Sequence, residues 1–265
     1  MAQTETAAKD ARSEAFVKAR RAGEGIPVYP GDMPQTLEEA YKIQDSGISL
    51  WPSAIKGWKV GRVAGEWETK LGVDRLVGPV FEELCFDNHD DVHTMPVFGK
   101  GFAAVEGEVT AVIGKDVPEG KTDFTTEEAL GFIKSLHFGV EIASSPFPEI
   151  NDHGPLVTIS DFGNNFGLIL GKEIENWSDL ALADWEFETV INDKSVGKAA
   201  PTALPGGPVE SVRYLLENTA RRGLPLKAGM MVLTGAVTGV HQAYVGDASY
   251  VTLADDKISL RLTEA

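Results

Sequence analysis

The chain has 265 residues, of which 43% are hydrophobic, and a formal net charge of −16 at pH 7. This length allows one large domain with a sizeable core, or one domain with a small helical appendage. The negative charge argues against binding to nucleic acid or to an anionic membrane, because both require a basic surface. It leaves room for an anionic substrate, since a metal ion and a local lysine override the overall field.

The sequence predicts a cytoplasmic protein. No apolar run approaches the ~20 residues that span a bilayer. Residues 1–22 are polar and charged, so we expect no secretory signal peptide. The single Cys85 cannot form an intrachain disulfide and fits a reducing compartment, and we interpret it as an inert thiol rather than a nucleophile.

The first fifth of the chain has a helical pattern. Residues 4–22 are rich in alanine and charge, and residues 27–34 form a connector rich in proline and glycine. Residues 36–39 fit a capping box that opens a second helix, which ends near Pro52. From residue 55 the pattern changes to short strands broken by glycine. We therefore predict a helical N-terminal segment, residues 1–54, and a β-rich catalytic domain, residues 55–265.

The expected strands cover residues 55–61, 76–86, 102–114, 138–144, 156–160, 166–171, 185–191, 231–234, 250–254 and 257–262. Two helices interrupt them. One follows a capping box at residues 125–128 and carries Leu130, Ile133 and Leu136, and the other begins at Pro208. Regular alternation of strands and helices is missing, which indicates an α+β fold rather than a doubly wound sheet.

The most informative segment is residues 103–113, an apolar strand pattern with Glu106 and Glu108 in its middle. Side chains alternate along a strand, so these two carboxylates share one face. Adjacent like charges on an apolar strand are unfavourable unless a cation holds them or one is protonated. A site for Mg²⁺, Mn²⁺ or Ca²⁺ is the first hypothesis, and a solvated edge strand is the alternative.

Glu141 and Lys59 are the next candidates. Glu141 lies in another apolar strand pattern, and as a third carboxylate it would complete a set of ligands that leaves coordination positions for water and substrate. Its alternative role is to pair with a lysine. Lys59 lies between Gly57 and Gly61 on one strand face, where a ligand has room to approach, although a solvated lysine fits the same pattern.

Two loops offer further polar groups. Residues 161–165 follow a strand and are rich in donors, acceptors and turn formers. Thr234 and Gly235 end a strand, where a backbone N–H could bind a carboxylate oxygen. Both segments are also typical of simple turns. His89 and His93 have helical metal-ligand spacing but lie in a polar loop, so we predict no zinc site, and no phosphate-binding or nucleophile-elbow motif is present.

Taken together, these motifs resemble the 2-keto-4-pentenoate hydratase / 4-oxalocrotonate decarboxylase family of the fumarylacetoacetate hydrolase superfamily. The resemblance runs from about Thr36 to the C-terminus. Its motifs are Gly57-Trp58-Lys59-Val60-Gly61, Leu71-Gly72-Val73-Asp74, Val105-Glu106-Gly107-Glu108, Val140-Glu141-Ile142, Gly167-Leu168-Ile169-Leu170-Gly171, Lys227-Ala228-Gly229 and Val232-Leu233-Thr234-Gly235.

The resemblance implies a β-rich core of the fumarylacetoacetase C-terminal type, a homo-oligomer, and a small-molecule 2-oxo or 2-hydroxydienoic acid substrate from aromatic catabolism. It implies Mg²⁺ or Mn²⁺ held by Glu106, Glu108 and Glu141, and an active-site Lys59. We predict Lys59 and Asp161 as catalytic residues. The predicted substrate-binding residues are Asn164, Thr234 and Gly235.

The chain departs from the family pattern in three places. Hydratases usually have Asp-Phe-Gly or Asp-Tyr-Gly where this chain has residues 76–78, Leu-Val-Gly, so an acidic residue is missing. Asp74 or Glu82 could substitute for it. Two further segments, residues 144–146 and 160–165, also differ from the family pattern.

Three functions follow as hypotheses. The first is a metal-dependent hydratase that converts a 2-hydroxy-2,4-dienoate to a 4-hydroxy-2-oxo acid. The second is a decarboxylase or C–C hydrolase on the same scaffold. The third is a non-catalytic subunit that binds an active sister enzyme of the pathway.

Overall fold

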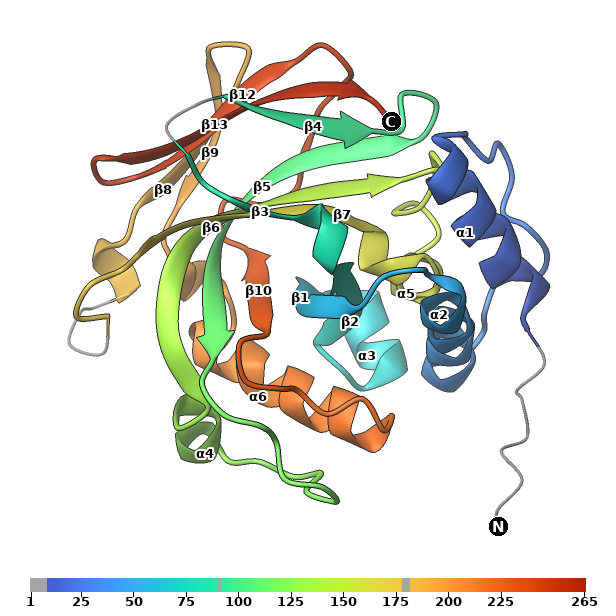
Figure 1. Cartoon of the computed structure of the whole chain (residues 1–265), viewed down its shortest axis with the longest axis horizontal. Coiled ribbons are helices and arrows are strands. Elements are labelled where there is room, and N and C mark those ends of the chain that lie inside the picture. Colours follow the sequence, from blue (N-terminus) through green and yellow to red (C-terminus); the bar gives the residue numbers. More distant parts are fainter. Residues whose placement is uncertain (1–8, 90–91, 178–181) are drawn as a thin grey trace.

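The structure is a computed structural model that describes residues 9–89, 92–177 and 182–265. An eight-stranded sheet forms its centre (Figure 1). Its strands are β1 (Ile55–Arg62), β2 (Arg75–Phe81), β3 (Cys85–Asp87), β5 (Phe102–Ile113), β6 (Ile133–Ser145), β7 (Asn165–Glu173), β10 (Met231–Ala236) and β11 (His241–Gln242). The order is β2-β1-β10-β5-β6-β7-β3, and β11 pairs with β5. The edge strand β2 contacts β7 near the other edge, so the sheet curls around an interior.

A second sheet of five strands covers the outer face of β5. Its order is β4-β13-β12-β8-β9, with β4 (His93–Val97), β8 (Phe187–Ile191), β9 (Lys194–Ala199), β12 (Ala248–Leu253) and β13 (Asp256–Glu264). The two sheets meet closely at Gly107, where an added Cβ would lie 2.7 Å from Val251 Cγ1. The apolar face of β5 therefore packs between sheets, and its other face points to the interior.

Within the described residues, six α-helices lie around the sheets: α1 (Ala11–Ala22), α2 (Leu37–Leu50), α3 (Glu66–Leu71), α4 (Thr126–Leu130), α5 (Pro155–Ser160) and α6 (Gly207–Arg221). Short 3-10 turns are η1 (Glu82–Leu84), η2 (Phe162–Asn164), η3 (Leu182–Asp184) and η4 (Pro201–Ala203). Helices α1 and α2 pack together on one side, and α6 packs with α4 at the end opposite the second sheet (Figure 1). No helix in the described ranges is long and apolar enough to cross a membrane.

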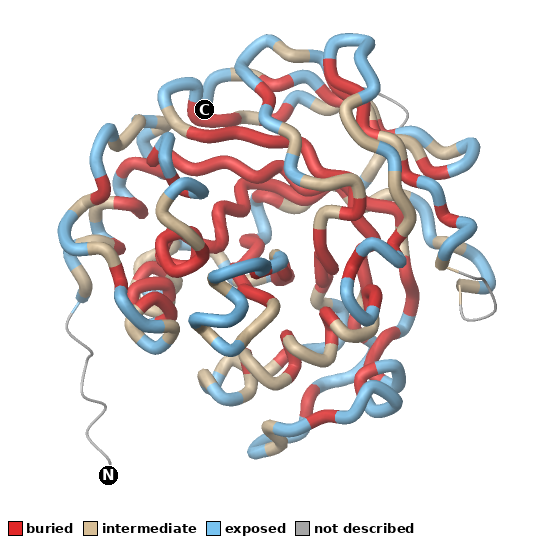
Figure 2. The backbone as a smooth tube through the Cα atoms, turned by 180° about the vertical axis from the view of Figure 1, so that it is seen from behind, coloured by how far each residue is buried: buried red, intermediate tan, exposed pale blue. Residues whose placement is uncertain are grey.

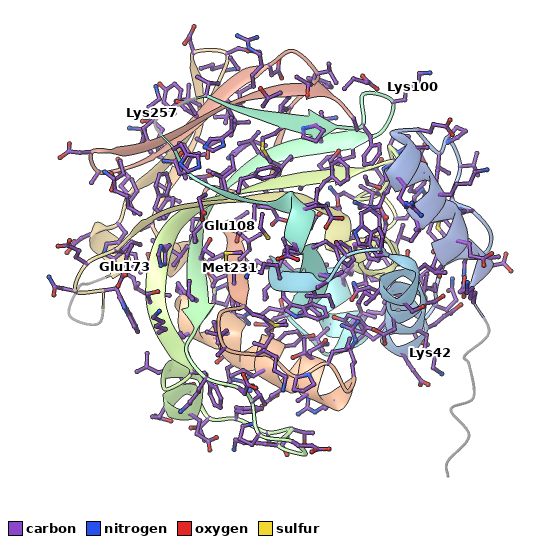
Figure 3. The ribbon with its side chains drawn as sticks, viewed as in Figure 1. Lys42, Lys100, Glu108, Glu173, Met231 and Lys257 are labelled. Carbon is purple, nitrogen blue, oxygen red and sulfur yellow. The ribbon has the colours of Figure 1, made fainter. Side chains whose placement is uncertain are left out.

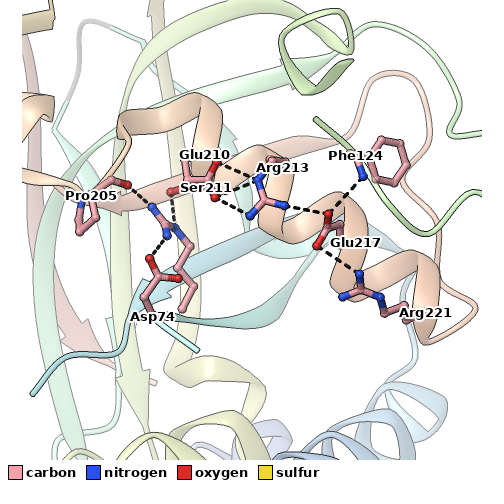
Figure 4. A network of polar contacts seen from close by, with 9 residues as sticks. Asp74, Phe124, Pro205, Glu210, Ser211, Arg213, Glu217 and Arg221 are labelled. Atoms are coloured by element: carbon pink, nitrogen blue, oxygen red, sulfur yellow. Dashed lines mark hydrogen bonds and ion pairs between the residues drawn. The ribbon is translucent and has the colours of Figure 1, made fainter. Parts of the chain in front are cut away.

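The core follows the strands. Figure 2 shows the buried backbone running through the centre of the molecule, with exposed segments mainly at its periphery. A polar network ties α6 to β2 (Figure 4). In it, Arg75 contacts Asp74, the Ser211 hydroxyl and the Pro205 carbonyl, while Arg213 joins Glu210 to Glu217. This network fixes the segment that precedes α6.

The α+β fold class and the β-rich core are confirmed. The strand predicted at residues 156–160 is wrong, because this segment is helix α5. Gly154 at φ 85° turns the chain, and Pro155, which has no backbone N–H to donate, suits the first helical turn. Ile133 and Leu136 lie on β6 rather than on the helix opened by Thr125, which ends at Leu130.

The predicted strand over residues 76–86 is two strands, β2 and β3, separated by η1. The strands predicted at residues 250–254 and 257–262 form a hairpin, in which Leu253 on β12 pairs with Asp256 on β13 across a turn at residues 254–255. Thr36 caps α2 as expected, with its side chain accepting from the Glu39 N–H. The first predicted helix covers residues 4–22, and its residues 4–8 lie outside the described residues.

Candidate active site

Three glutamates meet in the interior of the curved sheet. Glu106 on β5 is the direct cross-strand partner of Glu141 on β6, and Glu108 is two residues further along β5. Each offers a carboxylate oxygen within 4.8 Å of the others, and none is more than 3% exposed. Figure 3 labels Glu108 in the inner part of the molecule, and its cross-strand partner on β10 is Ala236. The predicted shared face is confirmed, and the alternative of a solvated edge strand is wrong, because β5 lies between β10 and β6.

Neighbouring groups orient two of these carboxylates. The Gly235 N–H donates to Glu108 Oε2 at 2.9 Å, and Asn165 Nδ2 donates to Glu141 Oε1 at 2.9 Å. Their other oxygens have no hydrogen-bond partner, although Glu141 Oε2 lies 3.4 Å from the Lys59 ammonium. Buried carboxylate oxygens that face one another without donors are the ligands that a hard divalent cation requires. The residues present therefore fit such an ion.

Lys59 is the positive charge of this cluster. Its Nζ lies 3.4 Å from both Glu141 Oε2 and Asn164 Oδ1, and its side chain is buried. Burial opposes its charge, but the attraction of Glu141, Glu106 and Glu108 outweighs this effect and raises the pKa of Lys59. The lysine is therefore an ammonium at neutral pH, suited to stabilise negative charge and unsuited to accept a proton.

The charged forms of Glu106 and Glu108 are disfavoured in this cluster. Burial, with repulsion from Glu141, raises the pKa of Glu106 to about 8 against the opposing attraction of Lys59. Burial and repulsion from Glu141 and Glu106 raise the pKa of Glu108 well above its usual range. One ammonium does not neutralise three buried carboxylates, so a cation or protons must supply the remaining positive charge.

A cavity of about 670 Å³ connects this cluster to the surface. Lys59, Glu106 and Asn164 form its polar floor, and each is buried. Its walls come from the segments that follow β1 and β10, from α3, α5 and η4, and from Leu76 of β2. The volume lies in the range of small-molecule sites.

The chain is similar in sequence to hydratases. The chain is 25% identical over 245 residues to the 2-keto-4-pentenoate hydratase of Paraburkholderia xenovorans (strain LB400), covering 90% of this chain and 88% of that protein. It is 28% identical over 227 residues to the 2-hydroxyhexa-2,4-dienoate hydratase of Comamonas testosteroni, covering 83% and 84%. The chain resembles the 2-keto-4-pentenoate hydratase / 4-oxalocrotonate decarboxylase family. No family model matches the chain.

Solved structures show the same fold. The 4-oxalocrotonate decarboxylase from Pseudomonas putida G7, complexed with magnesium and adipate, superposes with a TM-score of 0.77 at 20% identity, covering 95% of this chain and 96% of that one. A fumarylpyruvate hydrolase from Pseudomonas aeruginosa, in complex with Mn²⁺ and pyruvate, gives a TM-score of 0.57 at 15% identity, with coverages of 81% and 91%. The predicted resemblance and the prediction of a hydratase-like enzyme are confirmed.

Asp161, predicted as catalytic, is not a member of the glutamate cluster. Its carboxylate is fully buried and accepts from Arg20 Nε at 2.5 Å, from Arg20 Nη2 at 2.8 Å and from the Ser145 hydroxyl at 2.6 Å. It does not line the cavity. A carboxylate whose two oxygens are engaged in this way, away from the cavity, holds the fold together. This placement gives no support to the predicted catalytic role of Asp161.

Of the three predicted substrate-binding residues, Asn164 lines the cavity, whereas Thr234 and Gly235 do not. Asn164 lines the cavity beside Lys59. Thr234 is buried with its hydroxyl on the Val109 carbonyl at 2.7 Å, so it stabilises the pairing of β10 with β5. The Gly235 N–H binds a carboxylate, as its position suggested, but the carboxylate is that of Glu108. Thr234 and Gly235 therefore position the cluster and do not line its cavity.

The missing acidic residue has no replacement at the predicted positions. Asp74 pairs with Arg75, Glu82 is exposed on η1, and neither lines the cavity. Leu76 occupies the position of the missing acidic residue. A Cβ added to Gly61 would lie 3.2 Å from Leu76 Cδ1 and 3.6 Å from the Lys59 ammonium, so these two groups lie close to each other. Asp152 is the one carboxylate besides Glu106 among the described residues that line this space.

Other residues at or behind the site carry weaker sequence signals. Asn165 orients Glu141, and its loop was singled out only as a group of polar turn residues. Arg20 lies in a charge-rich helix whose pattern gives no sign of burial, and Trp67 of α3 lies in no recognisable motif. Burial raises the pKa of Cys85 to about 12, which agrees with an inert thiol.

Proposed function

We propose that this protein is a divalent-metal-dependent hydratase that adds water to a 2-hydroxy-2,4-dienoate and forms a 4-hydroxy-2-oxo acid. The observation that carries the proposal is the buried cluster of Glu106, Glu108 and Glu141 beside Lys59, at the floor of a cavity of small-molecule size. The similar hydratases named above support this choice of reaction.

Glu106, Glu108 and Glu141 would hold the ion, for which we propose Mg²⁺ or Mn²⁺. When bound, this ion supplies Lewis-acid stabilisation of negative charge on the substrate's carboxylate and 2-oxygen. Gly235 and Asn165 keep two of the carboxylates in place, each through one hydrogen bond. The open cavity beside Glu106 leaves room for the substrate.

Lys59 would act on the substrate directly. Its ammonium stabilises the negative charge that develops when the 2-hydroxyl loses its proton, and it can donate a proton in return. A proton added at C5 gives the conjugated 2-oxo-3-enoate. Water then adds its oxygen to C4 and a proton to C3, which balances the product. Asn164 Oδ1 accepts from the Lys59 ammonium at 3.4 Å and helps to hold it at the cavity floor.

A decarboxylase or C–C hydrolase is the second candidate function. The observation that favours it is Leu76, an apolar side chain next to the Lys59 ammonium. Hydration needs a polar group to direct a water molecule toward C4, whereas decarboxylation of a 2-oxo acid needs mainly an acceptor for the released electron pair. Exposed Asp152 is the cavity carboxylate available to direct water.

Proton NMR of the purified protein tests both candidates. With 2-hydroxypenta-2,4-dienoate and Mg²⁺ we expect 4-hydroxy-2-oxopentanoate, and with EDTA no product. Release of CO₂ from 4-oxalocrotonate, with the dienoate unchanged, would support the decarboxylase. Activity that arises only after a second chain is added would instead support the role of a partner subunit.

The Glu106→Ala variant is the control for the site. It removes a cavity-facing carboxylate, so we expect metal-dependent turnover to disappear. Near-normal turnover by a folded Glu106→Ala protein would contradict the assignment of the metal ligands.

A further inference from the structure

The cavity has two chemically different parts. Its floor carries Lys59, Glu106 and Asn164, all buried. One side of its wall is apolar, formed mainly by Val63, Trp67, Leu76, Leu204, Val237 and Val240, and Arg62, Asn151, Asp152, Thr158 and Thr238 are its polar lining. A ligand that matches this arrangement has a polar head and an apolar tail, because an apolar wall rewards burial of hydrocarbon and penalises an unpaired charge.

The size of the cavity exceeds that of the simplest substrate. A five-carbon hydroxydienoate has about eight non-hydrogen atoms, and even at the ~30 Å³ that a water molecule occupies in the liquid it would take up roughly 240 Å³. The cavity measures about 670 Å³. More than half of the space therefore lies beyond a short substrate, where the apolar residues form part of the lining.

The wall begins directly beside the reacting end. Leu76 lies over Gly61 together with the Lys59 ammonium, so hydrocarbon surface starts next to the head of the substrate. Buried Leu204 and Val237 continue this surface toward the mouth, where Val240 is 57% exposed. None of these side chains could stabilise a second carboxylate.

Trp67 forms the outer part of the wall. Its ring packs directly on Gly154, where an added Cβ would lie 2.3 Å from the ring, and the Lys70 ammonium lies 4.4 Å from its centroid. These contacts hold a flat aromatic face at the cavity. The nearby charged residues of the lining, Arg62 and Asp152, are exposed and of opposite sign, so the mouth has no uniform charge to attract an anion.

We infer that the substrate carries an extended apolar group, alkyl or aryl, on the far end of its hydroxydienoate head, and that Trp67 and Leu76 select this group over a second carboxylate. This inference rests on the proposed function for the head of the substrate. It adds a distal subsite, and it assigns the reaction that supplies the substrate to a class that cleaves a ring or chain carrying such a substituent.

Calorimetric titration with unreactive 2-oxo acids tests the subsite without turnover. The ligands are 2-oxopentanoate, 2-oxo-6-phenylhexanoate and 2-oxoadipate, each titrated into the full-length protein with saturating Mg²⁺. We expect the phenyl compound to bind at least about tenfold more tightly than 2-oxopentanoate, because its ring and methylenes leave water. We expect 2-oxoadipate to gain no affinity.

Three variants complete the design. Trp67→Ala should bring the affinity ratio of the phenyl compound to 2-oxopentanoate toward one, and Trp67→Phe should keep most of it. Val240→Asp places a carboxylate on an exposed part of the wall without disturbing the core, and it should also lower the ratio. Val28→Ala, at a 72% exposed position outside the lining, should leave the ratio unchanged.

The outcomes separate the two proposals. Equal binding of 2-oxopentanoate and the phenyl compound, or preference for 2-oxoadipate, would overturn the apolar subsite and leave the head site standing. Failure of all three ligands to bind in Mg²⁺ would overturn the head site and, with it, the proposed function.

Discussion

Arg20 of the N-terminal helix α1 and Asp161, 141 positions later, form a buried ion pair with donor–acceptor distances of 2.5 and 2.8 Å. The same guanidinium donates to the backbone carbonyls of Ser144, Asp161 and Asn165. It therefore holds both ends of η2, the turn whose residues Phe162, Gly163 and Asn164 all have positive φ. Asn164 and Asn165 then contact Lys59 and Glu141.

Replacement of Arg20 should be costly. In Arg20→Met the buried Asp161 carboxylate loses its counter-charge, and breaking such a pair costs about 3–5 kcal/mol. For a chain of this size we expect the melting temperature to fall by roughly 10 °C. Arg21→Met, at the exposed neighbouring position, is the matched control. Thermal unfolding followed by circular dichroism measures both, and equal melting temperatures would contradict the role of Arg20.

Gly78 should be required for the same turn. A Cβ at this position would lie 2.0 Å from the Phe162 carbonyl oxygen, so Gly78→Ala must push β2 away from η2. We expect a loss of about 1–3 kcal/mol from this overpacking. Gly131→Ala is a suitable control, since its backbone has φ −69° and its added Cβ would meet no atom closer than 3.3 Å. Urea unfolding of both variants measures the difference; comparable losses would show that close packing at Gly78 is unimportant.

Arg20 and Asp161 show which part of the site the sequence alone does not predict. Alternation along one strand was enough to place Glu106 and Glu108 together, because that pattern is local. The pairing of Glu106 with Glu141 depends on sheet register and is observed only in the fold. Arg20 and Asp161 each lie in a segment with an ordinary local interpretation, a charged helix and a polar turn. Their burial comes from tertiary packing, which local sequence patterns do not predict.

Asn165 should tune the affinity for the metal ion. It donates to Glu141 Oε1 from full burial, and residues that orient a metal ligand typically contribute about 10–100-fold to affinity. We expect Asn165→Leu to weaken Mn²⁺ binding by this factor in calorimetric titrations. Asn218→Leu on α6, remote from the cluster, should bind Mn²⁺ as the unaltered protein does. Unchanged affinity of Asn165→Leu would mean that Glu141 is not a ligand or needs no orientation.

Glu108→Gln should raise the stability of the metal-free protein and at the same time weaken metal binding. Without metal, Glu108 is repelled by Glu141 and Glu106, so a neutral amide relieves the cluster and should raise the melting temperature in EDTA at pH 8. The same change removes a ligand, so the rise in melting temperature on addition of Mg²⁺ should largely disappear. A variant that is less stable in EDTA, yet still stabilised by Mg²⁺, would contradict both parts of this argument.

The raised pKa of Glu106 predicts an unusual pH dependence for the metal-free protein. Its pKa is about 8 in the folded state and about 4.3 in an unfolded chain, so between these values the folded state binds more protons. The free energy of unfolding must then fall as pH rises across this window. Carboxylates whose pKa values are lowered, such as Asp10 and Glu39, titrate below it and do not mask the effect between pH 6 and pH 8.

Melting temperatures in EDTA should therefore be lower at pH 8 than at pH 6. With saturating Mg²⁺ the difference should shrink or reverse, because metal binding replaces the protons that the carboxylates would otherwise hold. Glu106→Gln has no proton to lose at this position, so its melting temperature in EDTA should depend less on pH. A metal-free protein that gains stability from pH 6 to pH 8 would show that Glu106 is ionised in the fold, with Lys59 alone sufficient to hold the cluster together.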